Sequence, residues 1–127
     1  MVKTALHITE QDMALYRATA RQREAKAEQK RLLRLQRART VASRAANLLR
    51  EQFGATRILL FGSLVQGQVF HQDSDIDMAV GGIRSQDFWR AWSALDAISA
   101  EFEIDLVPIE TASPRLSLVF QEGGVEL

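Results

Sequence analysis

The chain has 127 residues, 46% of them hydrophobic and 25% charged, which is the size of one globular domain with an extension and is cramped for two independent domains. It contains no cysteine, so disulfide bonds, thiolate nucleophiles and zinc–thiolate sites are excluded, and oxygen atoms remain as ligands for any metal ion. No apolar run approaches the roughly 20 residues that span a bilayer, and the N-terminus has no signal-peptide core, so we expect a cytoplasmic protein with no membrane partner.

The net charge of zero conceals a strong asymmetry along the chain. Residues 1–57 contain 13 Lys or Arg and 5 Asp or Glu, whereas residues 58–127 contain 3 and 11, so the two parts carry +8 and −8. The basic part could attract the acidic part of the same chain, another copy of it, an acidic protein or RNA. Composition alone does not choose among these partners.

A long helix is predicted for the N-terminal part. Thr9 is a suitable N-cap, and no Pro or Gly follows before Gly54, which is suited to end the helix. Residues 20–31 offer only alanines and long polar side chains, which indicates a solvated segment, whereas the stretch from Leu32 to Phe53 has apolar residues at three- and four-residue steps. We therefore divide the chain into a basic helical arm, residues 1–40, and a domain, residues 41–127.

The rest of the chain predicts an α/β (α+β) fold with a small mixed sheet and packed helices. Strands are expected at residues 58–61, 75–80 and 103–107, where apolar residues form short runs or alternate with polar ones. Helices are expected at residues 85–100, with Ser85 as N-cap, and after Ser113-Pro114, ending at Gly123-Gly124.

Carboxylates on two of these strands point to a metal site. Asp75 and Asp77 lie two residues apart on one strand, so both side chains face the same side of the sheet. Asp105 has the same alternation on the next strand and would join them if the two strands are neighbours. Crowded carboxylates repel one another unless a cation neutralises them, and Mg²⁺ prefers oxygen ligands. Three carboxylates could hold two ions, which act together in phosphoryl transfer.

A Gly-Ser turn precedes this cluster and suggests an anion site. Gly62 follows the strand at residues 58–61 and lets the backbone approach a ligand closely. Ser63 offers a hydroxyl and an amide at a predicted helix N-terminus, where anions are favoured. The order and spacing of the turn and the carboxylates are more informative than either alone.

These motifs resemble the minimal nucleotidyltransferase (MNT) branch of the DNA polymerase β superfamily. The resemblance runs from about Ala42 to Leu127 and includes Gly62-Ser63 with Gly67, Asp73-Ser74-Asp75-Ile76-Asp77, and Glu103-Ile104-Asp105-Leu106. It implies that Asp75 and Asp77 are paired metal ligands, that Asp105 is the third ligand and assists the attacking hydroxyl, and that Gly62 and Ser63 bind the nucleotide phosphates.

The resemblance also implies an activity and a partner. Members of this branch commonly pair with a toxin of the HEPN type, and some transfer AMP from ATP to it, so we expect a Mg²⁺-dependent protein adenylyltransferase that acts as an antitoxin. Two alternatives stay open: an antitoxin that neutralises its partner by binding alone, and an RNA-binding protein that uses the basic helix. RNA binding is weakly supported, because no aromatic residue is interleaved between Tyr16 and Phe53. The same helix could also mediate oligomer formation.

Overall fold

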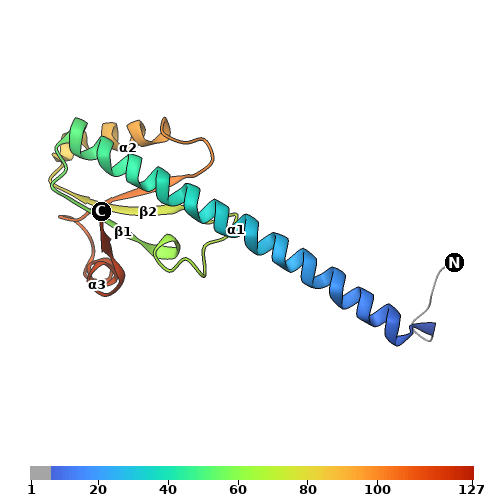
Figure 1. Ribbon diagram of the computed structural model, residues 1–127. Helices are drawn as coiled ribbons and strands as arrows, with labels where there is room; N and C mark the ends of the chain where they lie inside the picture. The colour runs from blue at the N-terminus through green and yellow to red at the C-terminus, as the bar shows by residue number, and fades with distance from the viewer. Residues whose placement is uncertain (1–6) are drawn as a thin grey trace. The chain divides into compact units, whose positions relative to one another are not determined.

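The computed structural model describes residues 7–127, which form two compact units, one ending at Leu33 and one spanning Arg34–Leu127. The chain is mixed α and β, with three α-helices and four strands among the described residues (Figure 1). Within that part of the chain, no helix combines the length and the apolar content that crossing a membrane would require.

The first helix, α1, spans Glu10–Phe53 and begins with the predicted Thr9 cap. The Thr9 hydroxyl accepts a hydrogen bond from the Asp12 N–H at 3.1 Å, and the Asp12 carboxylate accepts one from the Thr9 N–H at 3.0 Å. This reciprocal pair satisfies two amides that the helix itself leaves free. The helix ends before Gly54, whose φ of +70° is a conformation that glycine adopts without strain.

Burial along α1 follows its sequence pattern. All residues from 21 to 30 are exposed, as predicted for the solvated segment. In the unit that begins at Arg34, one stripe of the helix is buried, and its members are mostly small: Leu35, Ala38, Val41, Ala42, Ala45, Ala46 and Leu49. Leu32, which the apolar pattern included, is 45% exposed.

Four strands form one sheet in the order β3-β2-β1-β4. β1 (Arg57–Phe61) is antiparallel to both β2 (Ile76–Gly81) and the short β4 (Val125–Glu126), and β2 is parallel to β3 (Ile104–Pro108). The three longer strands confirm the sequence prediction, and the pairing of β2 with β3 meets the condition under which Asp105 would join Asp75 and Asp77. β4 was not predicted, because two exposed residues at a sheet edge carry no periodic signal.

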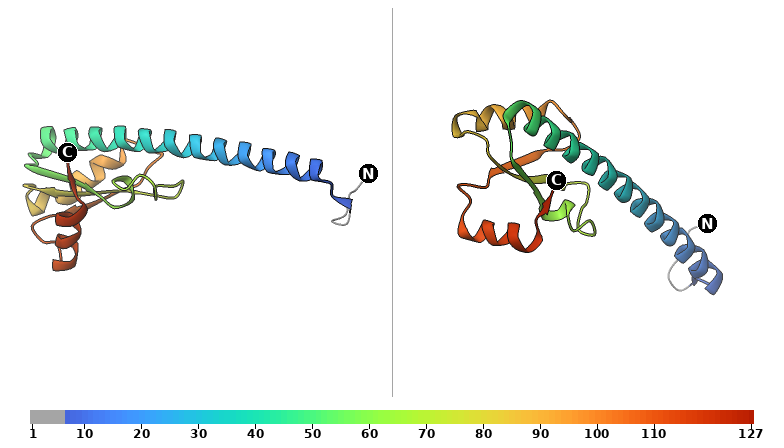
Figure 2. Two further views of the ribbon diagram at one scale, coloured as in Figure 1. Left: turned by 60° about the horizontal axis from the view of Figure 1, so that its bottom comes forward. Right: turned by 60° about the vertical axis from the view of Figure 1, so that its left-hand side comes forward.

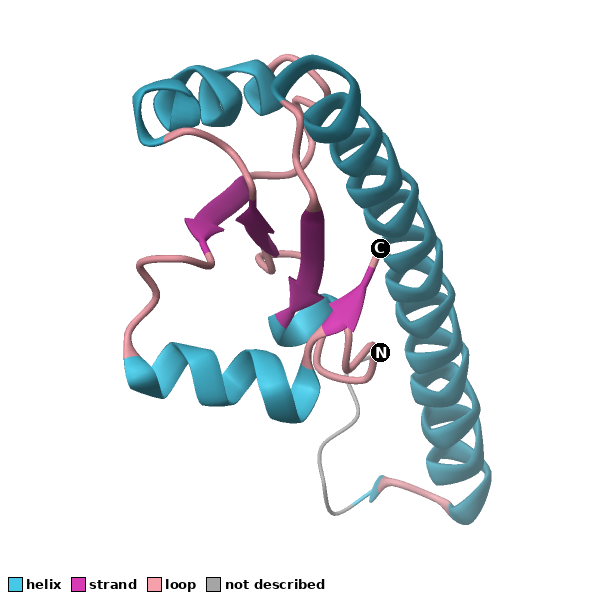
Figure 3. Cartoon of the chain, turned by 90° about the vertical axis from the view of Figure 1, so that its left-hand side faces the viewer, coloured by secondary structure: helices cyan, strands magenta, loops and turns pink. Residues whose placement is uncertain are grey.

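The sheet has an apolar layer on each face within residues 34–127. One layer joins the stripe of α1 and helix α2 (Phe88–Asp96) to inward residues of the strands, among them Ile58, Met78 and Leu106. The other is smaller and joins Leu59, Phe61 and Ala79 to Phe120 of helix α3 (Pro114–Gly123). Figures 2 and 3 show α3 on the side of the sheet opposite to α2. The smaller layer matters for function because Asp77 and Asp105 share its face of the sheet.

Two details of the predicted helices differ. Ser85 is not the N-cap of α2 but starts a short 3-10 helix, η3 (Ser85–Asp87), and α2 ends at Asp96 rather than near residue 100. The helix after Ser113 is confirmed, since the Ser113 hydroxyl accepts a hydrogen bond from the Leu116 N–H at 3.2 Å and Pro114 opens the first turn.

Candidate active site

Asp77 and Asp105 lie side by side on adjacent strands. They are direct partners in the parallel register of β2 and β3, and each is the second residue of its strand. Paired residues in a sheet point to the same face, so both carboxylates lie on the face that α3 covers in part. Asp75 directly precedes β2 and lies two residues before Asp77. All three side chains are half-buried.

The charges of these residues act on Asp77. The pKa of the Asp77 carboxyl is raised to about 6, first by burial and then by the negative charges of Asp105 and Asp75. Burial disfavours an ionised carboxyl because water no longer solvates it, and nearby like charges disfavour it further. Asp105 and Asp75 are therefore both close enough to disfavour the ionised form of Asp77.

Gly62 brings a backbone turn against the Asp77 carboxylate. Phe61, the last residue of β1, pairs with Asp77, and the chain then turns through Gly62 with φ of +76°. A Cβ atom at Gly62 would overlap the Asp77 Oδ2 atom and lie 3.2 Å from its Cγ. Only glycine fits here, both because of the left-handed backbone and because of the carboxylate beside it.

Ser63 lies in the turn that follows. It is half-buried in a single-turn 3-10 helix, η2 (Gly62–Leu64), at the place where the sequence predicted a helix N-terminus. Backbone N–H groups at such a turn can still face a bound anion. The turn and the carboxylates are thus neighbours in space, as their order in the sequence predicted.

Ser74 closes the loop that leads into β2. It is 8% exposed, its hydroxyl accepts a hydrogen bond from the His71 N–H at 3.0 Å, and its own N–H donates to the His71 carbonyl at 3.0 Å. This turn fixes the backbone directly before Asp75. Asp and Ser residues are common in such turns, and here Asp73 and the His71 side chain are at the surface while Ser74 is buried.

The chemistry of the carboxylates suits Mg²⁺. Among residues 7–127, no group of three or more His, Asp or Glu side chains is already arranged to enclose a metal ion. Mg²⁺ usually takes only one or two protein carboxylates and completes its shell with water and substrate phosphates. Asp77 and Asp105, side by side and repelling each other, provide such donors, and the assignment of Asp75, Asp77 and Asp105 as ligands stays a prediction.

Comparisons with known proteins agree with this geometry. Residues 44–126 match the family model described as polymerase beta, nucleotidyltransferase. The chain is similar to a solved toxin–antitoxin with AMP-PNP, with 29% identity and a TM-score of 0.57 over 67% of this chain and 70% of that one. A mutant of the MntA–HpeT toxin–antitoxin is 30% identical, with a TM-score of 0.56 over 67% and 69%.

A third similar structure is of a protein assigned to the minimal nucleotidyltransferases. It is 26% identical, with a TM-score of 0.59, and the match covers 73% of this chain and 95% of that one. No functionally curated protein matches the sequence.

Proposed function

We propose that this chain, which belongs to the polymerase β nucleotidyltransferase family, transfers AMP from ATP to a hydroxyl group of a partner protein. The observation that carries the proposal is the pairing of Asp77 with Asp105 beside the Gly62 turn. A similar protein binds AMP-PNP, an analogue of ATP, which supports ATP as the nucleotide. The minimal nucleotidyltransferase fold, which this chain shares, supports the class of reaction.

Asp75, Asp77 and Asp105 are the proposed ligands of one or two Mg²⁺ ions. When bound, Mg²⁺ would offset the negative charge of the triphosphate and of the leaving pyrophosphate. The raised pKa of Asp77 has a consequence for loading, because a cation must compete with the proton on this carboxyl below about pH 6.

Gly62 and Ser63 are the proposed phosphate-binding residues. Because Gly62 has no side chain, its backbone lies against the Asp77 carboxylate, and a phosphate at this turn would be next to the acidic residues. Ser63 would donate its hydroxyl and its backbone N–H to phosphate oxygens. These contacts orient the α-phosphate for in-line attack.

In the proposed reaction the oxygen of an acceptor hydroxyl forms a bond to the α-phosphorus, and the bond from that phosphorus to the bridging oxygen of the β-phosphate breaks. Pyrophosphate leaves with the bonding electrons, and AMP stays on the acceptor. Asp105 is the proposed acceptor of the hydroxyl proton, since it faces the same side of the sheet as Asp77 at the same level.

A toxin of the HEPN type is the proposed partner, so the chain would act as an antitoxin. Two of the similar structures are toxin–antitoxin complexes, at 29% and 30% identity, and this supports the pairing. Modification of the toxin would then be the means of neutralising it. The rival is an antitoxin that neutralises by binding alone.

The test compares wild type with Asp77→Ala in the presence of the partner toxin, Mg²⁺ and ATP labelled on its α-phosphate. Asp73→Ala serves as the control, because Asp73 is an exposed acidic residue in the loop before β2. We expect wild type and the control to label and neutralise the toxin and Asp77→Ala to do neither. Equal neutralisation by all three proteins without transfer of label would favour the binding-only antitoxin and contradict the enzymatic proposal.

A further inference from the structure

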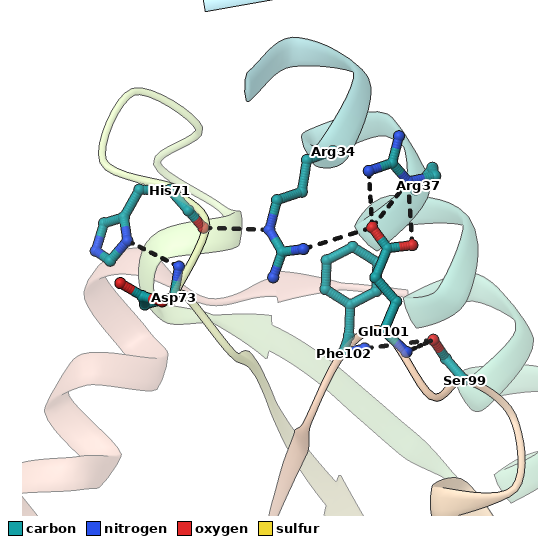
Figure 4. A network of polar contacts seen from close by, with 7 residues as sticks. All are labelled: Arg34, Arg37, His71, Asp73, Ser99, Glu101 and Phe102. Atoms are coloured by element: carbon teal, nitrogen blue, oxygen red, sulfur yellow. Dashed lines mark hydrogen bonds and ion pairs between the residues drawn. The ribbon is translucent and has the colours of Figure 1, made fainter. Parts of the chain in front are cut away.

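Arg34 makes contacts that its place in the sequence does not suggest. It falls within the segment that the sequence assigns to the basic arm, yet its side chain is only 18% exposed. Figure 4 shows the guanidinium between two loops, one leading into β2 and the other into β3. These are the loops that precede the acidic residues of the candidate site.

Arg34 reaches the first loop through His71. Its Nε–H donates a long hydrogen bond of 3.4 Å to the His71 carbonyl oxygen, which also accepts the Ser74 N–H at 3.0 Å. Ser74 is buried and directly precedes Asp75. Arg34 is therefore joined to the turn that sets the start of β2.

Arg34 reaches the second loop through Glu101 and Phe102. The centre of the guanidinium lies 4.5 Å from the centroid of the buried Phe102 ring, and Nη1 donates to Glu101 Oε1 at 3.4 Å. A guanidinium over an aromatic ring is attracted by the electrons of the ring face. Phe102 lies three residues before Asp105, so this contact sets the start of β3.

The two strand starts are also joined to each other, because the Ile76 N–H donates to the Glu103 carbonyl at 2.9 Å. We propose that Arg34 is a positioning residue, which holds both loops against α1 and so keeps Asp75 and Asp77 level with Asp105 when a divalent cation and a nucleotide bind. The inference rests on the proposed function, in which these carboxylates share the cation.

Arg37 provides a matched control on the same helix. It binds the same Glu101 carboxylate more closely than Arg34 does, through three hydrogen bonds of 2.7–3.1 Å. Its side chain is 54% exposed, and all three bonds go to Glu101. Loss of Arg37 removes the better ion pair with Glu101 and leaves the contacts of Arg34 with His71 and Phe102 in place.

The test measures the binding of Mn²⁺ together with AMP-PNP by titration calorimetry in wild type, Arg34→Ala, Arg34→Lys and Arg37→Ala. We expect Arg34→Ala to bind about tenfold more weakly, as is typical when a group supporting metal ligands is lost. Arg34→Lys should stay impaired, because an ammonium group cannot lie flat on Phe102 and donate to both loops. Arg37→Ala should bind within about twofold of wild type, because exposed ion pairs contribute little.

Urea unfolding shows which variants are folded. If Arg34→Ala does not fold, the binding of Mn²⁺ and AMP-PNP by Arg34→Lys is compared with that of Arg37→Ala instead. Equal weakening in the Arg34 and Arg37 variants, unchanged binding in all of them, or full recovery in Arg34→Lys would overturn the inference. Absence of AMP transfer by a wild type that binds Mn²⁺ and AMP-PNP would contradict the proposed reaction instead, and the comparison of Arg34 with Arg37 would still hold.

Discussion

Replacing Asp77 with Asn should make the metal-free protein more stable at neutral pH. Moving a carboxyl pKa from its ordinary 3.8 to about 6 corresponds to about 3 kcal/mol of unfavourable free energy for the ionised form in the folded state. Asp77 is only half-buried, so we discount this to about 1–2 kcal/mol for screening by solvent. Asn has a similar shape and no charge, and would remove that cost.

The size of this stabilisation depends on pH. Because the pKa is raised in the folded state, the folded protein binds the proton more tightly, and the contribution of Asp77 to wild-type stability falls as pH rises from about 4 to about 6. Asp77→Asn should lack this fall, so the two proteins should be equally stable near pH 4 and differ fully above about pH 6. Urea unfolding in EDTA, followed by the fluorescence of Trp89 and Trp92, measures the difference.

Asp73→Asn is the control, since Asp73 is exposed and Asn is equally suited to a turn. It should change stability by less than about 0.5 kcal/mol at either pH. Asp77 would not carry the unfavourable charge described above if Asp77→Asn is no more stable than wild type at pH 7.5, or if the substitution stabilises the protein as much at pH 4 as at pH 7.5. Addition of Mn²⁺ and AMP-PNP should stabilise wild type more than Asp77→Asn, because only wild type keeps the full set of ligands.

Three further substitutions test separate parts of the account. Gly62→Ala should lower the free energy of unfolding in urea by about 1–3 kcal/mol more than Gly54→Ala does. Both glycines have positive φ, but only a Cβ at Gly62 meets the Asp77 carboxylate. Equal losses in the two variants, or an excess loss that persists unchanged in an Asp77→Ala background, would contradict this. Ser113→Ala should cost about 1 kcal/mol, seen as a lower Tm, because α3 loses its cap, and an unchanged Tm would show that the cap is dispensable. Asp105→Asn should slow AMP transfer by about 100-fold or more while the partner still binds; transfer at the wild-type rate would exclude Asp105 as the proton acceptor.

Local patterns predicted most of the fold. The caps at Thr9 and Ser113 and the glycine after Phe53 act through neighbouring residues, so the sequence is enough to place these helix ends. The 3-10 helix at Ser85–Asp87 was missed because a serine cap signal does not distinguish the two kinds of helical turn. β4 forms by pairing with β1, which is distant in the sequence, and its two exposed residues show no pattern that predicts a strand.

The candidate site also has features that the sequence predicted and features that only the structure reveals. Strand alternation predicted that Asp75 and Asp77 share a face, and the parallel register then brought Asp105 level with Asp77. A side chain at Gly62 would overlap Asp77 because β1 pairs antiparallel with β2, and the sequence analysis did not predict that pairing. Arg34 could not have been found, because an arginine within a basic helix looks solvated until its partners 37 and 67 residues away are placed.

The most direct test of the central claim is a crystal structure of the protein with AMP-PNP and Mn²⁺, with the ion located by its anomalous scattering. We predict an ion at about 2.0–2.3 Å from carboxylate oxygens of Asp77 and Asp105 and from phosphate oxygens, with the triphosphate against the Gly62-Ser63 turn. An ion bound away from these aspartates, or a triphosphate on another face of the sheet, would contradict the account.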